Sequence, residues 1–201
     1  MNTKTMHNLT YGLFVLGAND GEKLTGCITN TVIQQTSDPL TISVSVNKSN
    51  YTNEIIKKTH QLTVSILDES VPFDIFKRFG FSSGRDTNKL EGFNDYKVTA
   101  NNTFYLTKYA NAYLSGEVVQ EVDLSTHTIF IVEIKEAEVL SDIPSVTYTY
   151  YFKNIKPKPN TTKKKGWVCT ICGYVYEGEV LPPDFICPIC KHPASDFKPI
   201  E

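Results

Sequence analysis

The stretch Cys169-Thr-Ile-Cys172, followed fourteen residues later by Cys187-Pro-Ile-Cys190, decides the fold of the C-terminal part of the chain. Four of the five cysteines of the chain lie in it. Each Cys-x-x-Cys pair places two thiolates on one tight turn, and two facing pairs form a tetrahedral four-sulfur cage that suits zinc or iron. Two disulfides or a catalytic dithiol are the alternatives, but two dithiol pairs in one short segment are typical of a metal site.

The residues around these cysteines separate iron from zinc. Residues 166–176 resemble the first knuckle of a rubredoxin, residues 182–190 resemble the second, and Phe197 stands where that family has a core aromatic. The segment between the knuckles is shorter than in free-standing rubredoxins and is similar to that of the module attached to rubrerythrins. The resemblance covers residues 166–201 and implies one iron that cycles between the ferric and ferrous states. Its four ligands would be Cys169, Cys172, Cys187 and Cys190.

Because the protein fills all four ligand positions, such a site can pass on an electron but cannot bind a substrate. Zinc in the same cage would be redox-silent, and the sequence leaves zinc open as the alternative metal. An iron site that passes on electrons requires an electron donor, which could bind to the rest of the chain.

Length and composition indicate an ordinary globular protein. The chain has 201 residues, which suggests one or two domains, with 40% hydrophobic and 21% charged residues. The formal net charge of -2 gives no overall basic field for nucleic acid or membrane. The N-terminus lacks the apolar core of a signal peptide, and no apolar run approaches the roughly 20 residues of a membrane helix. These features, and cysteines kept as thiolates, predict a cytoplasmic protein.

Alternating apolar residues predict that the first 150 residues are mainly β. We expect strands at residues 11–16 and 23–32 around the turn Asn19-Asp-Gly21, and a strand opened by Pro39 in which Leu40 to Val46 alternate with polar residues. A helix should span residues 51–59, with Ser49 or Asn50 as its N-cap. Further strands are expected at 62–66, 112–122 and 128–135, and a short helix at 71–79. The pattern predicts a β-barrel with a few short helices.

The character of the sequence changes near residue 153. Residues 155–165 contain five lysines and two prolines, which predicts an extended, solvated linker. A basic docking segment for an acidic partner is the alternative. We therefore predict three parts: a barrel at residues 1–152, a linker at 153–165 and a rubredoxin-like domain at 166–201.

The barrel lacks the common nucleotide and hydrolase signatures. No G-x-G-x-x-G follows a strand, and neither a Walker-type motif nor G-x-S-x-G is present. The segment from Asn47 to Thr52 does offer anion chemistry, because it joins a strand end to a helix start and carries a lysine and several hydroxyls. Free amides at a helix N-terminus bind phosphate well. A capped helix beside a solvated lysine is the alternative interpretation.

Several motifs in sequence order resemble the FMN-binding split barrel of the flavin reductase-like family. They comprise Thr10-Tyr-Gly-Leu13, residues 26–36, Ser45-Val-Asn-Lys48, Arg78-Phe-Gly-Phe81 with Lys89, Thr126-His-Thr-Ile-Phe130 and Thr147-Tyr148 with Tyr151. Thr10 departs from the usual serine. The match covers residues 5–152 and implies a homodimer with FMN near the subunit interface.

Residue by residue, the resemblance implies three groups of contacts. The isoalloxazine and ribityl chain would be bordered by Thr29, Asn30, Thr31 and Gln34. The ribityl-phosphate end would be held by Ser45, Val46, Asn47, Lys48, Ser49 and Thr52, with Lys89 as a further phosphate candidate. His127 stands where related reductases place a histidine near the nicotinamide, while Cys27 is expected to be a small buried residue.

The two modules together resemble the high-molecular-weight rubredoxins of anaerobes. A flavin accepts a hydride from NADH or NADPH and releases electrons singly, which a one-electron iron site requires. The resemblance therefore implies electron transfer from NAD(P)H through FMN to the iron, and on to a flavodiiron protein that reduces oxygen or nitric oxide. The alternatives are a flavin reductase that releases reduced FMN, and a non-enzymatic flavin-binding barrel with a zinc ribbon for protein interaction.

Overall fold

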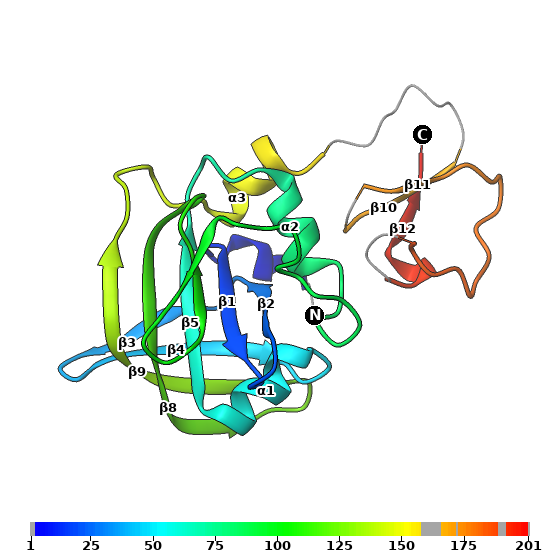
Figure 1. Cartoon of the computed structure of the whole chain (residues 1–201). Coiled ribbons are helices and arrows are strands. Elements are labelled where there is room, and N and C mark those ends of the chain that lie inside the picture. The colour runs from blue at the N-terminus through cyan, green and yellow to red at the C-terminus, as the bar shows by residue number, and fades with distance from the viewer. Residues whose placement is uncertain (1–2, 158–165, 172, 189–191, 201) are drawn as a thin grey trace. The chain divides into compact units, whose positions relative to one another are not determined.

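The structure, a computed structural model, describes residues 3–157, 166–171, 173–188 and 192–200. The chain forms two compact units, Met1–Tyr151 and Phe152–Glu201, which are described separately (Figure 1). No helix in these described ranges is long and apolar enough to cross a membrane.

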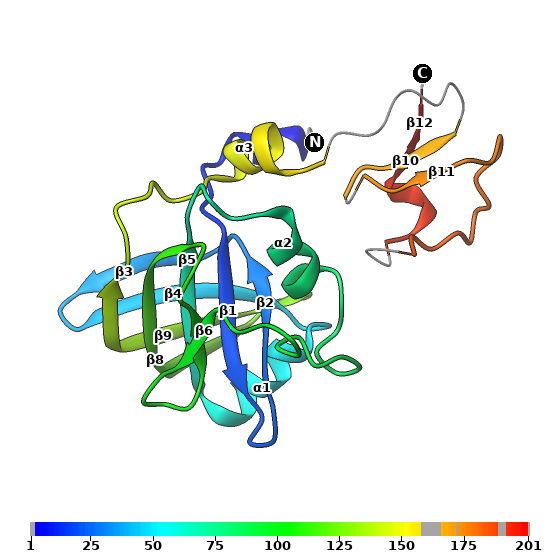
Figure 2. The ribbon, with the colours of Figure 1, turned by 45° about the horizontal axis from the view of Figure 1, so that its top comes forward.

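The first unit is built on a seven-stranded sheet in the order β2-β1-β5-β8-β9-β4-β3. All of its neighbouring strands run antiparallel, and the sheet curls round on itself (Figures 1 and 2). The strands are β1 Phe14–Asn19, β2 Leu24–Thr29, β3 Ile33–Ser37, β4 Leu40–Asn47, β5 Gln61–Leu67, β8 Ala110–Asp123 and β9 His127–Val139. The predicted mainly β fold is confirmed.

The first hairpin forms where the sequence predicts it. Gly21 has a φ of 99°, and the Asp20 carboxylate accepts hydrogen bonds from the amides of Glu22 and Lys23 at 2.8 Å, so the turn residues supply the reversal. The predicted strand over 23–32 is too long, because β2 ends at Thr29 and the chain then starts a separate strand, β3. We missed β3 because its residues, IQQTS, are all exposed and carry only one apolar side chain.

The core of the barrel lies on the inner face of the sheet. Ile42, Val44 and Val46 of β4 are buried there with Phe130 and Val132 of β9, as the alternation predicts. Helix α1, Tyr51–Thr59, adds Ile55 and Ile56 to the same cluster. The side chain of Asn50 accepts a hydrogen bond from the amide of Thr52 and so caps this helix. Its bounds and one of its two predicted caps are confirmed.

A short hairpin covers the outer face of β1, β5 and β8. Its strands, β6 Tyr96–Val98 and β7 Phe104–Leu106, are too short to give a periodic signal and were not predicted. The Tyr105 ring stacks on Tyr113 with centroids 3.8 Å apart. The buried hydroxyl of Thr63 bonds those of Thr103 and Ser115 beneath the hairpin, so these polar groups are satisfied.

The remaining helices of the first unit are short. Helix α2, Phe73–Gly80, starts two residues later than predicted, because Pro72 is its N-cap. A 3-10 turn, η1, spans Thr3–Asn8, and a single helical turn, α3, spans Tyr148–Tyr150. A π-helical turn, η2, follows at Tyr151–Ile155 across the boundary between the units.

The second unit holds a three-stranded sheet in the order β11-β10-β12. Its elements are β10 Trp167–Cys169, β11 Val175–Tyr176, η3 Ala194–Asp196 and β12 Phe197–Pro199. Phe185 packs edge-on against Phe197, with ring centroids 5.4 Å apart, and tilts against Tyr176 at 4.7 Å. The indole Nε1 of Trp167 donates to the carbonyl of Glu179 at 3.3 Å. This small aromatic core includes Phe197, which the sequence predicts to be a core residue.

Gly17 lets the short hairpin approach the sheet. A Cβ at this position would lie 2.2 Å from the carbonyl oxygen of Phe104. We expect Gly17→Ala to lower the free energy of unfolding by about 1–3 kcal/mol, because one backbone must move away from the other. Urea denaturation followed by far-UV circular dichroism measures this.

The matched control is Gly80→Ala, whose new Cβ would meet its nearest atom, Ile28 Cγ1, at an ordinary 3.4 Å. It should change stability by no more than about 0.5 kcal/mol. Equal effects of the two substitutions would contradict the packing described for Gly17.

Candidate functional site

The segment Asn47 to Thr52, the 47–52 corner, connects the end of β4 to the start of α1. The Asn47 side-chain oxygen accepts hydrogen bonds from the amide and the hydroxyl of Ser49 at 2.9 and 2.8 Å. The amide of Asn50 donates to the Asn47 carbonyl at 3.0 Å. These bonds fix a tight turn that leads into the first turn of α1, where amides without helical partners gather.

Lys48 is held by its backbone at this corner. Its amide donates to the carbonyl of Thr126 at 2.9 Å, which ties the corner to the turn between β8 and β9. Its side chain is 38% exposed, and the ammonium lies 3.4 Å from a carboxylate oxygen of Asp123. Lys48 therefore presents a positive charge at the surface beside the start of α1.

Two other predicted contact residues turn their side chains inward. Val46 is 2% exposed and Thr52 is 1% exposed, so both residues are buried. Cys27 is buried as well, and desolvation raises the pKa of its thiol, an effect that the Thr52 side chain partly offsets. The carbonyl of Val46 accepts a hydrogen bond from the side-chain Nδ2 of the buried Asn53 at 3.0 Å. Cys27 is the small buried residue that we expect.

A second group of predicted residues meets beside β4. The Thr31 hydroxyl donates to the Ser45 carbonyl at 2.8 Å and lies 3.0 Å from the Thr29 hydroxyl. Gln34 lies on the exposed strand β3, where its amide donates to the Thr36 carbonyl at 3.3 Å. Asn30 follows the end of β2 and is half-buried. The structure thus brings Thr29, Thr31 and Ser45 together, while Gln34 lies on the neighbouring edge strand.

His127 lies at the same end of the sheet as the corner. The pairing of β4 with β9 sets Asn47 opposite His127. The imidazole Nδ1 lies 2.8 Å from the Thr126 hydroxyl, and the side chain is half-buried. The residues predicted for phosphate and for nicotinamide are therefore neighbours across two strands.

Lys89, the further phosphate candidate, points into the fold. It is 5% exposed, and its ammonium donates to the carbonyls of Gly26 and Phe79 at 2.9 Å each. Burial lowers its pKa to about 8. Phe79 lies in the last turn of α2, where a cation also meets the negative end of the helix dipole. In this structure Lys89 joins the segment after α2 to the barrel, and a phosphate contact from it stays a prediction.

Sequence reasoning missed two charged residues near the corner. The guanidinium of Arg85 stacks over Tyr51, 4.8 Å from the ring centroid, and pairs with Glu54 of α1. Asp123, at the end of β8, lies between Lys48 and Lys57. Their roles depend on contacts between residues 31 and more positions apart, and no local motif signals such contacts.

In the second unit, the structure describes two of the four predicted metal ligands. Cys169 and Cys187 are buried, at 1% and 0% exposed. The amide of Gly173 donates to the Cys169 carbonyl at 2.9 Å, and Gly173 adopts a φ of 79° that closes the first knuckle. The amide of Cys187 donates to the His192 carbonyl at 2.8 Å. Cys172 and Cys190 lie outside the described residues, so the four-cysteine cage stays a prediction.

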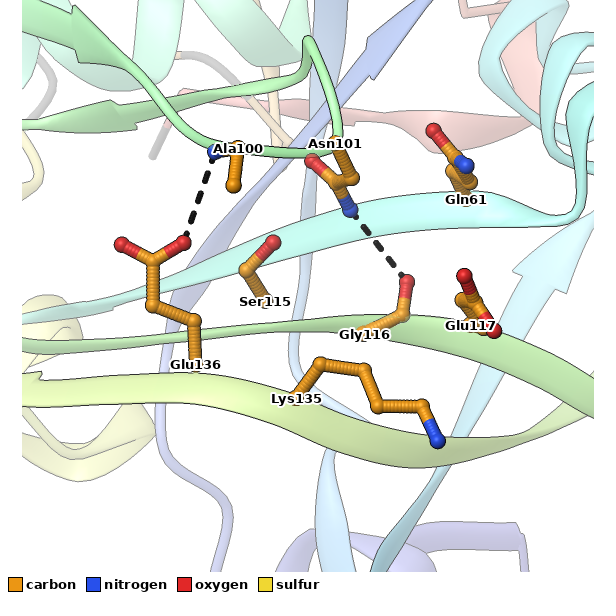
Figure 3. A pocket seen from close by; sticks show the side chains of 8 residues that line it. All are labelled: Gln61, Ala100, Asn101, Ser115, Gly116, Glu117, Lys135 and Glu136. Carbon is orange, nitrogen blue, oxygen red and sulfur yellow. Dashed lines mark hydrogen bonds between the residues drawn. The ribbon is translucent and has the colours of Figure 1, made fainter.

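A separate hollow of about 470 Å³ lies on the outer side of β8, beneath the turn between β6 and β7 (Figure 3). Glu136 reaches up to the amide of Ala100, and the Asn101 side chain points down to the carbonyl of Gly116. Both hydrogen bonds are long, at 3.5 and 3.4 Å. None of the residues that line this hollow belongs to the predicted cofactor or catalytic set.

The groups around the corner fit the parts of FMN. Amides at the start of α1 and the Lys48 ammonium suit a phosphate monoester. The hydroxyls of Thr29 and Thr31 and the backbone at Ser45 suit a polyhydroxyl chain, because they offer both donors and acceptors. In the second unit, the buried sulfurs of Cys169 and Cys187 suit a thiophilic metal.

Comparison with known proteins assigns the family. The flavin reductase like domain matches residues 6–158, and the rubrerythrin, rubredoxin-like domain matches residues 167–198. The high molecular weight rubredoxin of Moorella thermoacetica is 37% identical over an alignment of 230 positions that covers 100% of both chains. The chain belongs to the family of the high molecular weight rubredoxins. This confirms the resemblance stated from the sequence motifs.

Two further proteins are similar to the barrel of this high molecular weight rubredoxin family member. The ferric-chelate reductase (NAD(P)H) of Archaeoglobus fulgidus is 34% identical over 162 residues, covering 81% of this chain and 95% of that protein. Flavoredoxin from Methanosarcina acetivorans has the same fold, with a TM-score of 0.58 and 24% identity, over 65% of this chain and 69% of that one. The two matched domains make the chain an oxidoreductase of flavin-linked electron transfer, with flavin, NAD(P)H and iron as the groups they imply.

The buried Lys89 predicts a pH dependence of stability. The pKa of Lys89 is about 8 in the folded protein and 10.5 in an unperturbed lysine. Between these values the unfolded chain binds a proton that the folded chain does not, so the free energy of unfolding contributed by Lys89 rises with pH. From pH 7 to pH 10, the stability of the wild type relative to Lys89→Met should rise by about 2–3 kcal/mol.

Urea denaturation at pH 7, 8, 9 and 10 measures this difference. The matched control is Lys77→Met, because the Lys77 side chain is 50% exposed on α2. Wild type and Lys77→Met should give parallel curves of stability against pH. A parallel curve for Lys89→Met as well would contradict the buried placement of this lysine.

Proposed function

We propose that the chain is an NAD(P)H:rubredoxin oxidoreductase. In this proposal, electrons pass from NAD(P)H through FMN in the barrel to one iron held by Cys169, Cys172, Cys187 and Cys190. The observation that supports it most directly is the joint presence of a surface lysine beside the start of α1 in the barrel and two buried cysteines in the second unit. A hydride donor and a one-electron metal need a flavin between them, since a flavin handles both modes of transfer.

FMN is the proposed flavin because the corner suits a terminal phosphate monoester. Lys48, the amide and hydroxyl of Ser49, and the first amides of α1 would hold the phosphate end with Asn47. Thr29, Asn30, Thr31 and Gln34 would border the ring and the ribityl chain, with Ser45 and the backbones of Val46 and Thr52. Lys89 stays the further phosphate candidate of this proposal, with its ammonium bonded to two carbonyls inside the fold in this structure.

His127 is the proposed catalytic residue. Its Nδ1 is engaged by the Thr126 hydroxyl at 2.8 Å, which fixes the ring and leaves Nε2 for the nicotinamide side. We propose that it orients the hydride donor or holds a proton, because positioning is the main task of protein groups in hydride transfer.

The proposed acceptor is an external protein such as a flavodiiron protein, in oxygen or nitric oxide reduction in an anaerobe. A saturated iron site can pass electrons only outward, so it requires a protein partner. We propose the cytoplasm as the compartment, because thiolate ligands are maintained in a reducing environment.

A flavin reductase that releases reduced FMN is the second candidate. It is favoured by the exposure of Lys48, which lies at the surface rather than in a closed cavity. Turnover that depends on added free FMN would distinguish it from the internal relay.

The relay predicts that two absorption signals disappear together. Anaerobically purified protein containing flavin and iron should lose both the oxidised-flavin and the ferric-thiolate bands when NADH or NADPH is added, because electrons reach the iron. Stopped-flow spectroscopy measures both bands in one trace. Cys187→Ser, which removes one proposed ligand, should keep the flavin signal and lose the ferric-thiolate signal.

Bleaching of the flavin with an unchanged ferric-thiolate band would exclude the relay. Native protein that holds zinc and no flavin would exclude the proposed function as a whole.

We also propose a homodimer, formed through the outer face of β4, β9 and β8. Strand pairing puts Ile33 beside Ser43, Ser43 beside Ile131, and Ile129 beside Val122 on this face. Ile33 is 62% exposed and Val122 39% exposed. Apolar side chains gathered on the outer face next to a fully exposed edge strand favour a protein partner. A second copy is proposed because the same face carries Ser45, one of the predicted cofactor residues.

The proposed interface predicts that Ile33→Glu yields monomers. A buried charge without a partner strongly disfavours association, whereas the monomer tolerates it because the position is exposed. Light scattering after size-exclusion chromatography measures the mass. Val98→Glu is the matched control, since Val98 is 54% exposed on β6, which pairs with β7 in a separate two-stranded sheet. A dimeric Ile33→Glu variant, or a monomeric wild type, would rule out this interface.

A further inference from the structure

Asp123 is a carboxylate near the 47–52 corner that contacts three side chains. Its oxygens accept two hydrogen bonds from the Lys57 ammonium at 2.8 and 3.0 Å and one from the Thr128 hydroxyl at 2.9 Å. One of them lies 3.4 Å from the ammonium of Lys48. The carboxylate thus lies between two lysines, one of which is the proposed phosphate contact.

The backbone fixes this arrangement. Asp123 is the last residue of β8 and pairs with Thr128 of β9. The turn between the two strands is closed by the amide of Leu124, which donates to the His127 carbonyl at 2.8 Å. The same turn accepts the Lys48 amide at Thr126. Both Asp123 and Lys48 are therefore held by one hairpin, and their side chains meet without any long flexible segment between them.

The charges around Asp123 keep it ionised. The hydrogen bonds from Lys57 and Thr128 hold its pKa at about 2. Glu121 adds a second carboxylate near Lys57, with 3.8 Å between their nearest charged atoms. At neutral pH a negative charge is therefore always present beside Lys48. Asp123 also pairs with Lys57, so it stays ionised without Lys48.

An anion bound at Lys48 has to compete with this carboxylate. A phosphate ester would draw the Lys48 ammonium away from Asp123 and would itself be repelled by the Asp123 charge. A neutral molecule of the same shape would experience neither effect. The cost falls on the phosphate alone, because it arises from charge rather than from shape.

We propose that Asp123 is a specificity-determining counter-charge, which limits how strongly Lys48 binds the phosphate group of the flavin. The inference rests on the proposed FMN site. It identifies Asp123 as the residue that limits the preference of this site for FMN over riboflavin.

The test compares FMN with riboflavin on the full-length protein. Quenching of flavin fluorescence gives a Kd for each in the wild type and in Asp123→Asn, which keeps the shape of the side chain and an acceptor for Thr128. We expect the Kd for FMN to fall by about three- to fivefold, the range of a partly exposed ion pair. The Kd for riboflavin should stay unchanged, so the ratio of the two constants reports the phosphate alone.

Two further variants make the result specific. Asp74→Asn removes an equally negative carboxylate from an exposed pair with Lys77 on α2 and should leave the ratio unchanged. Lys48→Met should lower the preference for FMN over riboflavin. Adding Asp123→Asn to Lys48→Met should raise this preference by a smaller factor than Asp123→Asn does in the wild type. Non-additivity of this kind is expected when two residues act on one ligand group.

The possible outcomes distinguish a failure of the role of Asp123 from a failure of the proposed FMN site. An unchanged ratio in Asp123→Asn, weaker FMN binding, or equal shifts for both flavins would overturn the role of Asp123 and leave the FMN site standing. Wild-type protein that binds neither flavin would overturn the proposed function and the inference together.

Discussion

The antiparallel pairing of β4 with β9 is the constraint on which the candidate site depends. It sets Asn47 opposite His127 and Val46 opposite Thr128. The end of β4, which leads into α1, therefore lies beside the start of β9. A shift of one residue would turn Val44 and Val46 out of the core, because side chains alternate between the two faces of a sheet. The buried side of the sheet therefore fixes the position of polar groups on its rim.

The corner gains its chemistry from groups that the strands alone could not supply. Helix α1 starts there because Asn47 and Asn50 turn the chain and cap its first turn. The buried side chains of Thr52 and Asn53 anchor that turn to the interior. Amides of the corner, one lysine fixed by its backbone and the hydroxyls of Thr29 and Thr31 are thus brought together by bonds that also stabilise the fold. This overlap explains why the capped helix and the anion site were indistinguishable from sequence.

Elements with a strong local signal were predictable. Residues 51–59 form α1 as predicted, because a capping asparagine precedes an amphipathic segment, and β4 follows its apolar alternation. Strand β3 was missed because it buries none of its side chains, and β6 and β7 because each has only three residues. These strands form through pairing with neighbours that are already in place, so their own composition carries little information.

A short local motif allows a site residue to be proposed from the sequence. A role that depends on contacts between residues far apart in the sequence gives no such signal. The cysteine spacing predicts the two knuckles directly, and of the four cysteines the structure describes Cys169 and Cys187, which are buried as a ligand role requires. Lys89 was assigned to phosphate by its motif, although burial in the fold directs its ammonium to two carbonyls. Asp123 gave no signal, because its partner Lys57 lies 66 positions away in the sequence.

Trp167 has an optical consequence. It is the only tryptophan of the chain, and it lies in β10 of the second unit, two residues before Cys169. Indole emission, excited where tyrosine no longer absorbs, therefore originates in the cysteine-rich unit alone. The barrel is left to report through its tyrosines. Trp167 thus reports on one unit without any label, whereas tyrosine emission comes from both, because Tyr174 and Tyr176 lie in the second unit.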